Sequence, residues 1–308
     1  MNLIHKPVLV KDVLEFLDPK PGQRFIDATV DGGGHGLAIL EKITPGGKLL
    51  GVEWDAELLK QLEFKVKSSK FQEDIILVND SYVNLKEIAE QNDFMGADGI
   101  LFDLGLSSWH LESAGRGFSF QKDEPLDMRF AGAYADSQLP VSSGGLTAGE
   151  IVKDYSYDEL VKILKEYGEE RFAKSISAGI TKARKEKPIK STFDLIEVIK
   201  SSVPFWYRRG RLHFATKTFQ ALRIAVNNEL GNIEIGLERA LEVLRAGGCL
   251  SVITFHSLED RIVKIFFRSR AAMGNVEIAT KKPVMPSLDE ITANPRARSA
   301  KLRVAVKI

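Results

Sequence analysis

The chain has 308 residues, of which 44% are hydrophobic and 28% charged, with a formal net charge of +1. This composition predicts a globular protein with a sizeable core, in one large domain with an insertion or in two domains. The single cysteine, Cys249, excludes an internal disulfide framework, and its apolar neighbours predict a buried side chain rather than a nucleophile. No stretch resembles a signal peptide or a membrane span, so we expect a soluble cytoplasmic protein.

The first third of the chain alternates short apolar runs with helical patterns. Strands are predicted at residues 24–30, 48–53, 75–78 and 99–103, and the segment after the first one turns helical around residues 37–40. Continuous apolar strands separated by helices are typical of a parallel sheet covered on both faces. The sequence therefore predicts a doubly wound, Rossmann-like α/β fold that binds ligands at the carboxyl ends of its strands.

A helical region interrupts this pattern after about residue 112. Thr147 with Glu150, and Ser156 with Glu159, have the spacing of capping boxes, and further helices are predicted at 169–185 and 192–200. We therefore expect a discontinuous sheet domain, 1–112 and 214–308, around an all-helical insert, 113–213, that recognises the substrate.

The sheet pattern returns in the last third. A strand is predicted at 249–255, a capping box at Ser257 to Asp260 opens the next helix, and residues 276–280 and 302–308 are expected to pair as an antiparallel hairpin.

The loop after the first strand, residues 27–36, is the most informative segment. Its glycines allow close approach of a ligand to the backbone. Carboxylates at Asp27 and Asp31 would repel the pyrophosphate of a dinucleotide but attract a cationic sulfonium or ammonium group. The third glycine of the dinucleotide fingerprint is also missing, because its position falls on Leu37. The loop therefore favours S-adenosylmethionine over a nicotinamide cofactor, with a glycine-rich turn that binds nothing as the alternative.

Acids and one aromatic follow the later strands. Glu53 ends the second strand, where an acid can accept hydrogen bonds from both ribose hydroxyls. Asp80 and Tyr82 follow the third strand, where an aromatic ring could lie against adenine, and Asp103 ends the fourth. A single acid at a strand end is more often a cap or a turn residue. Four in succession at one edge of a sheet indicate a binding site.

Two segments carry basic residues without acids. The first, residues 205–217, interleaves aromatic residues with Arg208, Arg209, Arg211, His213 and Lys217, and the second covers residues 294–308. Basic and aromatic side chains together suit phosphate contact and base stacking, which favours RNA for the first segment. The alternative for the first segment is an ordinary solvated loop. For the second segment, RNA contact and an ordinary solvated segment are equally well supported.

Several motifs match one known family in order along the whole chain. They are HKPVL at 5–9, DGGGH at 31–35, DLGLSS at 103–108, RGFSF at 116–120, PLDMR at 125–129, YGEERFA at 167–173, HFATKTFQ at 213–220, FHSLEDR at 255–261 and NPRARS at 294–299. With these motifs the chain resembles the bacterial family of small-subunit ribosomal RNA cytidine N4-methyltransferases, called RsmH or MraW.

The resemblance implies an S-adenosylmethionine-dependent enzyme that methylates N4 of a cytidine in the decoding region of 16S rRNA. Its partner would be 16S rRNA or the small ribosomal subunit, with no membrane and no metal, and a homodimer is one option for its assembly. The cofactor positions of the family fall on Gly33, Gly34, His35, Glu53, Tyr82, Asp103 and His110. Three differ from the commonest family residue: Glu53 stands for Asp, Tyr82 for Phe and His110 for Gln. The change to His110 matters most, because a histidine side chain has a different reach from glutamine and titrates near neutral pH.

The acceptor amine of cytosine is a poor nucleophile, because its lone pair is delocalised into the ring. We expect Asp103 to hold N4 in line with the methyl–sulfur bond, a positioning effect; a role in cofactor binding alone is the alternative. The target base must leave its stack to react. Residues 116–129 and the basic segment are expected to bind the displaced base. The alternative for Arg129 is an ion pair with Asp127 in a structural turn.

Other classes of protein remain as alternatives. A dinucleotide-dependent oxidoreductase is disfavoured by the acids of the glycine loop. A non-catalytic RNA-binding or assembly protein is disfavoured by the full set of acids at the strand ends. A methyltransferase acting on amines of DNA or protein is the nearest alternative.

Overall fold

The computed structural model of the protein describes residues 7–131 and 145–308; His5 and Lys6 of the first matching motif lie outside them. The described chain forms two compact units, one of residues 1–107 and 230–308 and one of residues 108–229. The predicted borders are 112/113 and 213/214. The prediction places residues 108–112 and 214–229 in the sheet domain, whereas in the structure they belong to the second unit. Substrate recognition by the insert stays a prediction.

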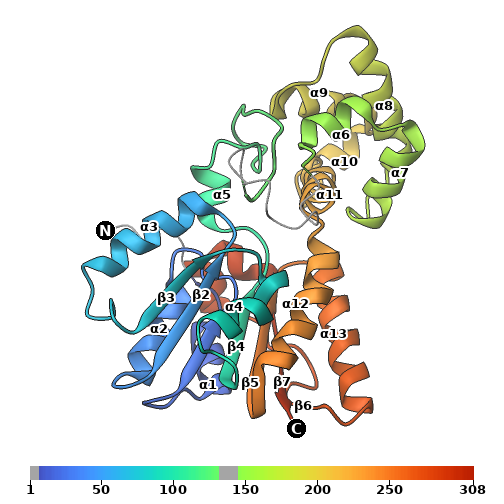
Figure 1. Ribbon diagram of the computed structural model, residues 1–308. Helices are drawn as coiled ribbons and strands as arrows, with labels where there is room; N and C mark the ends of the chain where they lie inside the picture. The colour runs from blue at the N-terminus through green and yellow to red at the C-terminus, as the bar shows by residue number, and fades with distance from the viewer. Residues whose placement is uncertain (1–6, 132–144) are drawn as a thin grey trace. The chain divides into compact units, whose positions relative to one another are not determined.

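The first unit is built on a seven-stranded sheet (Figure 1). Its strand order is β3-β2-β1-β4-β5-β7-β6, in which β1 to β5 are parallel and β7 is antiparallel to both of its neighbours. The strands are β1 (Arg24–Asp27), β2 (Lys48–Glu53), β3 (Ile75–Asn79), β4 (Ala97–Asp103), β5 (Leu244–Thr254), β6 (Val276–Ile278) and β7 (Lys301–Lys307). This sheet confirms the predicted Rossmann-like α/β fold and the antiparallel pairing near the C-terminus.

Helices cover both faces of the sheet (Figure 1). They are α1 (Val10–Leu17), α2 (Gly34–Ile43), α3 (Ala56–Lys67), η1 (Tyr82–Asn84), α4 (Leu85–Gln91), α12 (Glu229–Val243), α13 (Ser257–Ala272), α14 (Leu288–Ala293) and η2 (Pro295–Ser299). The apolar side chains of α4, α12 and α13 pack with Phe102 on one face, and those of α1 and α2 pack with Phe25 on the other. Both faces of the sheet are therefore shielded from solvent, as the continuous apolar strands predict. Cys249 is buried in the second layer, as expected.

In the residues that the structure describes, the second unit consists of helices joined by loops, with an isolated β-bridge between Pro125 and Ser191. Its helices are α5 (Ser108–Glu112), α6 (Ala148–Asp154), α7 (Tyr157–Glu166), α8 (Ala173–Glu186), α9 (Thr192–Ser202), α10 (Phe205–Arg208) and α11 (Thr216–Asn227). The two predicted capping boxes open α6 and α7 and are confirmed. The helix predicted from residue 169 begins only at Ala173, because Glu169 takes a left-handed conformation with φ of 46°. Among the described residues, no helix combines the length and apolar character needed to cross a bilayer.

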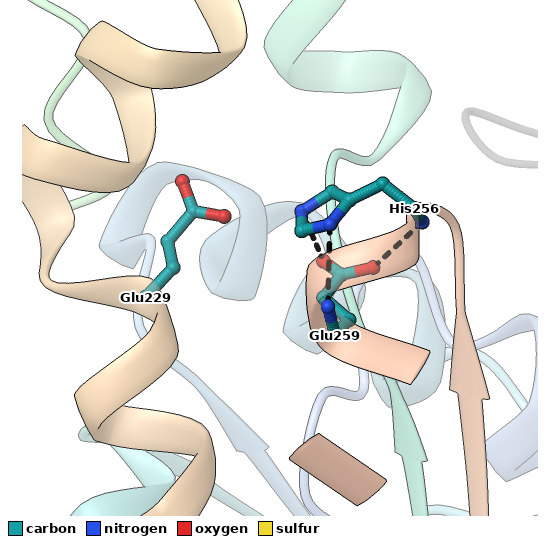
Figure 2. A group of neighbouring side chains, drawn as sticks. All are labelled: Glu229, His256 and Glu259. Carbon is teal, nitrogen blue, oxygen red and sulfur yellow. Dashed lines mark hydrogen bonds and ion pairs between the residues drawn. The ribbon is translucent and has the colours of Figure 1, made fainter. Parts of the chain in front are cut away.

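The helix after β5 begins one residue earlier than predicted. The capping box expected at Ser257 and Asp260 is wrong: His256 is the N-cap of α13, and Glu259 is its partner. The Nδ1 atom of His256 accepts the Glu259 N–H at 3.3 Å, and a Glu259 carboxylate oxygen accepts the His256 N–H at 3.1 Å (Figure 2). A histidine is an unusual cap, so the usual preference for serine pointed to the neighbouring residue.

Gly99 on β4 is required by packing. A Cβ atom built on Gly99 would lie 2.5 Å from a ring carbon of Phe25, which is itself buried. Replacement by alanine forces this ring out of its place, and overpacking of this kind costs about 1–3 kcal/mol.

We therefore predict that Gly99→Ala lowers the melting temperature of the protein by several degrees in calorimetry. Gly145→Ala is the matched control, because a Cβ atom there has no neighbour within 4 Å. Equal melting temperatures for the two variants would contradict the packing argument.

Candidate functional site at the carboxyl rim of the sheet

A polar residue ends each of four neighbouring parallel strands. These residues are Asp27 on β1, Glu53 on β2, Asn79 on β3 and Asp103 on β4. Because parallel strands end at the same edge of a sheet, the fold gathers them along one side, which we call the carboxyl rim. Asp27, Glu53 and Asp103 are buried, with 1%, 7% and 6% of their surface exposed. Burial of several carboxylates at one edge has no role in holding a sheet together and indicates a site.

The loop between β1 and α2 needs its glycines. Gly33 is the N-cap of α2 with φ of 80°, and a Cβ atom on it would lie 2.5 Å from a methyl group of Leu62. A Cβ atom on Gly34 would lie 2.8 Å from the ring of Pro7. Both glycines therefore let the loop pack closely against the rest of the first unit.

His35 and Asp103 form a buried pair at the rim. The Nε2 atom of His35 lies 3.4 Å from Oδ2 of Asp103, and the Asp103 N–H donates to Oγ1 of Thr29 at 2.6 Å. Burial by itself lowers the pKa of His35, but the Asp103 carboxylate, helped by Asp27, outweighs it and leaves the pKa raised. Burial also raises the pKa of Asp27 to about 6, although His35 opposes this rise. The raised pKa of His35 favours its protonated form, which would partly balance the two buried acids.

Glu53 is held by the backbone on both sides. One carboxylate oxygen accepts the Asp31 N–H at 3.0 Å, and the other accepts the Asp55 N–H at 2.8 Å. Burial raises the pKa of Glu53 to about 8, and the neighbouring Asp55 adds to the rise despite these hydrogen bonds. The pKa of Asp31 is also raised, through burial and the negative charges of Glu53 and Asp103. The rim is therefore a place where a cation would be stabilised.

Tyr82 lies in η1, directly after β3. Its ring packs edge-on against Phe102 with centroids 5.4 Å apart. Gly236 on α12 makes room for it, because a Cβ atom there would lie 2.6 Å from the Tyr82 ring. Tyr82 is thus a rigid, partly exposed aromatic at the same rim.

The structure brings together five of the predicted cofactor positions that belong to the loop and to the strand ends: Gly33, Gly34, His35, Glu53 and Asp103. His110 belongs to α5 in the second unit. There it is buried and packs edge-on against Phe118 and Phe130, with centroids 5.2 and 5.1 Å away.

The predicted RNA contacts of the second unit have unequal surroundings. Arg129 donates to both carboxylate oxygens of Asp127, at 2.7 and 2.8 Å. Arg208 donates twice to the Val203 carbonyl, and Lys217 donates to the Glu169 carbonyl.

The remaining candidates of this set face the surface. The Arg209 guanidinium lies over the Phe205 ring, His213 stacks on Phe120 with centroids 4.4 Å apart, and Arg211 is exposed.

Sequence reasoning missed two residues that shape the rim. Thr29 accepts the Asp103 N–H, and buried Asp55 caps α3 by accepting the N–H groups of Glu57 and Leu58. Asp55 could have been found, since an aspartate directly before a helix is a common N-cap. Thr29 could not, because its partner lies 74 residues away in the sequence.

Comparison with known proteins identifies the family. The sequence profile of the MraW methylase family matches residues 2–308. Ribosomal RNA small subunit methyltransferase H of Persephonella marina is 44% identical over 99% of both chains. The protein of the same name from Geobacter sulfurreducens is 43% identical over the full length of both chains. This chain belongs to the MraW methylase family.

Solved structures with a similar chain trace include TrmN from Thermus thermophilus, with a TM-score of 0.46 and 11% identity, over 97% of this chain and 48% of that one. A likeness of this size says nothing about activity.

The buried acids of the rim predict an unusual dependence of stability on pH. A carboxyl whose pKa is raised on folding stabilises the protein below its unfolded value, and this stabilisation is lost as the pH rises to the folded value. For Glu53 this window runs from 4.5 to about 8. We expect the melting temperature of Glu53→Gln, relative to that of the parent, to rise by roughly 3 °C or more between pH 5 and pH 8, since 1 kcal/mol shifts it by about 2–4 °C.

Glu57→Gln is the control, because this exposed carboxyl of α3 lies four residues away. A relative melting temperature of Glu53→Gln that stays constant across the window would show that burial does not raise the pKa of Glu53.

Proposed function

We propose that this protein transfers a methyl group from S-adenosylmethionine to the exocyclic N4 of a cytidine in the decoding region of small-subunit ribosomal RNA. One observation carries the proposal: a member of the MraW methylase family buries a group of carboxylates at its carboxyl rim. Relatives over the full length are named ribosomal RNA small subunit methyltransferase H. The chemistry of the rim suits a cationic donor and opposes an anionic pyrophosphate.

The residues of the rim fit S-adenosylmethionine, which supplies a methyl group on a cationic sulfur. Asp27, Asp31 and Asp103 supply the negative charge that attracts the sulfonium and ammonium groups. Glu53 accepts hydrogen bonds from the ribose hydroxyls, and Tyr82 offers its ring to adenine. We assign Gly33, Gly34 and His35 to the loop that borders the cofactor, and His110 to a further contact.

Asp103 is the residue that we assign to the acceptor amine. Its carboxylate accepts a hydrogen bond from N4, which draws electron density toward the nitrogen and holds it in line for transfer. The pair with His35 and the hydrogen bond from the Asp103 N–H to Thr29 fix the orientation of this carboxylate. The proton released from N4 after transfer passes to water.

The role of Asp103 is tested with Asp103→Asn, which keeps the shape and removes the charge. We expect the single-turnover rate of methyl transfer to fall by about 10²-fold or more. The affinity for S-adenosylhomocysteine in calorimetry, where no sulfonium is present, should fall by less than about tenfold. A rate that falls only as far as the affinity would assign Asp103 to cofactor binding alone.

The second unit is the part that we assign to the RNA. The substrate is 16S rRNA or the small ribosomal subunit, in the cytoplasm, and the protein could act as a homodimer. The candidate RNA contacts are Arg129, Arg208, Arg209, Arg211, His213 and Lys217. Arg211 is the sharpest candidate for a phosphate contact, because it is exposed in a segment without acids. Arg208 and Arg129 also have structural partners.

We predict that RNA binding weakens steeply with salt and that Arg211→Ala makes this dependence shallower. Each lost phosphate contact lowers the slope of log K against log salt by about 0.7 for a single strand. Fluorescence anisotropy with a labelled oligoribonucleotide over a range of salt concentrations gives the slope. Lys185→Ala, an exposed lysine of α8, is the control. Equal slopes for the two variants would remove Arg211 from the RNA surface.

A further inference from the structure

The second unit exposes two adjacent aromatic side chains on α10. Phe205 is 62% exposed and Trp206 is 57% exposed. Removing large aromatic side chains from water lowers the free energy of the system. Neighbouring aromatic side chains on a surface therefore often mark an interaction site.

The ring of Trp206 is held in place by its neighbours. It meets Phe172 and Tyr207 edge-on, with centroids 5.7 and 6.0 Å away. The Tyr207 hydroxyl in turn donates to the buried carboxylate of Glu170, whose two oxygens lie 3.0 and 2.9 Å away. The exposed ring therefore loses little conformational freedom on binding a partner.

Arginines accompany both exposed rings. The Arg171 guanidinium lies 5.3 Å from the ring centroid of Trp206, and that of Arg209 lies 4.4 Å from that of Phe205. Arg211 follows on the exposed loop. Residues 203–217 contain no acid, and the arginines beside the two rings outnumber the Glu170 carboxylate that Tyr207 contacts.

We propose that Phe205 and Trp206, with Arg171 and Arg209, form a surface on which unpaired bases of the RNA substrate stack outside the cytidine that reacts. This inference rests on the proposed function for the identity of the RNA. Aromatic rings stack on any base, while arginine contacts phosphate or stacks as well. Positive charge beside exposed rings fits single-stranded RNA better than it fits an apolar protein face or double-stranded RNA, whose bases are hidden.

The test compares an oligoribonucleotide from the decoding region with an abasic strand of equal length, which keeps the phosphates and lacks the bases. Anisotropy measures the binding of each to the full-length protein without cofactor. We expect Trp206→Ala to weaken binding of the first strand by at least about fivefold and binding of the abasic strand hardly at all. Trp206→Phe, which keeps a ring, should bind nearly as the parent does.

Phe193→Ala is the matched control, because Phe193 is an exposed aromatic on α9 of the same unit, 46% exposed. It should leave the affinity for both strands unchanged. Tryptophan fluorescence gives a second readout: stacking should quench the parent, and Trp206→Phe, which retains Trp54 and Trp109, should lose that quenching.

Three results would overturn the inference. The first is parental affinity of Trp206→Ala for the base-containing strand. The second is an equal loss for both strands, which would mean that Trp206 only supports the basic loop. The third is unchanged binding of both strands with weaker binding of the assembled subunit, which would make the surface a protein docking site.

The outcome is separable from that of the proposed function. Binding is measured without S-adenosylmethionine, so a stacking surface that binds RNA in a protein unable to methylate cytidine would refute only the function. Methylation that proceeds while Trp206→Ala binds like the parent would refute only the surface.

Discussion

The protein buries more negative than positive charge at one edge of its sheet. Asp27, Glu53 and Asp103 are nearly inaccessible there, and Asp31 lies among them. The imidazole of His35 pairs with Asp103 and opposes the rise in the pKa of Asp27. Removing a carboxylate from water is costly unless a partner compensates it. The raised pKa values of Asp27 and Glu53 express that cost. A cation entering the rim would reduce this cost, and for that reason we assign the sulfonium of S-adenosylmethionine to this site.

The surrounding fold serves to keep these acids in place. Parallel strands bring their carboxyl ends to one edge, and backbone N–H groups of Asp31 and Asp55 hold the two oxygens of Glu53. Gly33 and Gly34 allow the loop to lie against Leu62 and Pro7. The loop geometry is thus fixed by packing within the sheet unit before any ligand arrives. A site of this kind is preorganised, which keeps the ordering cost of binding low.

The helical unit, which we assign to the RNA substrate, would face a different ligand. RNA presents phosphates and π faces rather than one small cation, and its recognition requires positive charge and exposed rings. Several arginines of this unit, such as Arg129 and Arg208, have carboxylate or carbonyl partners inside the unit. Position in a basic segment therefore does not by itself assign a side chain to RNA. We therefore base the proposed RNA surface on exposed aromatic rings with cationic neighbours, and not on arginines whose partners lie inside the unit.

The sequence by itself determined the sheet class, the helical interruption, two capping boxes and the row of acids at the strand ends. These follow from local pattern: apolar runs, capping spacing and the position of a residue just after a strand. Only the tertiary structure decided the pairing of His35 with Asp103, the support from Thr29, the cap at His256 and the exposure of Trp206. Each of these depends on segments distant in the sequence or on local geometry that residue preferences do not encode, because burial and pairing are properties of the packed chain.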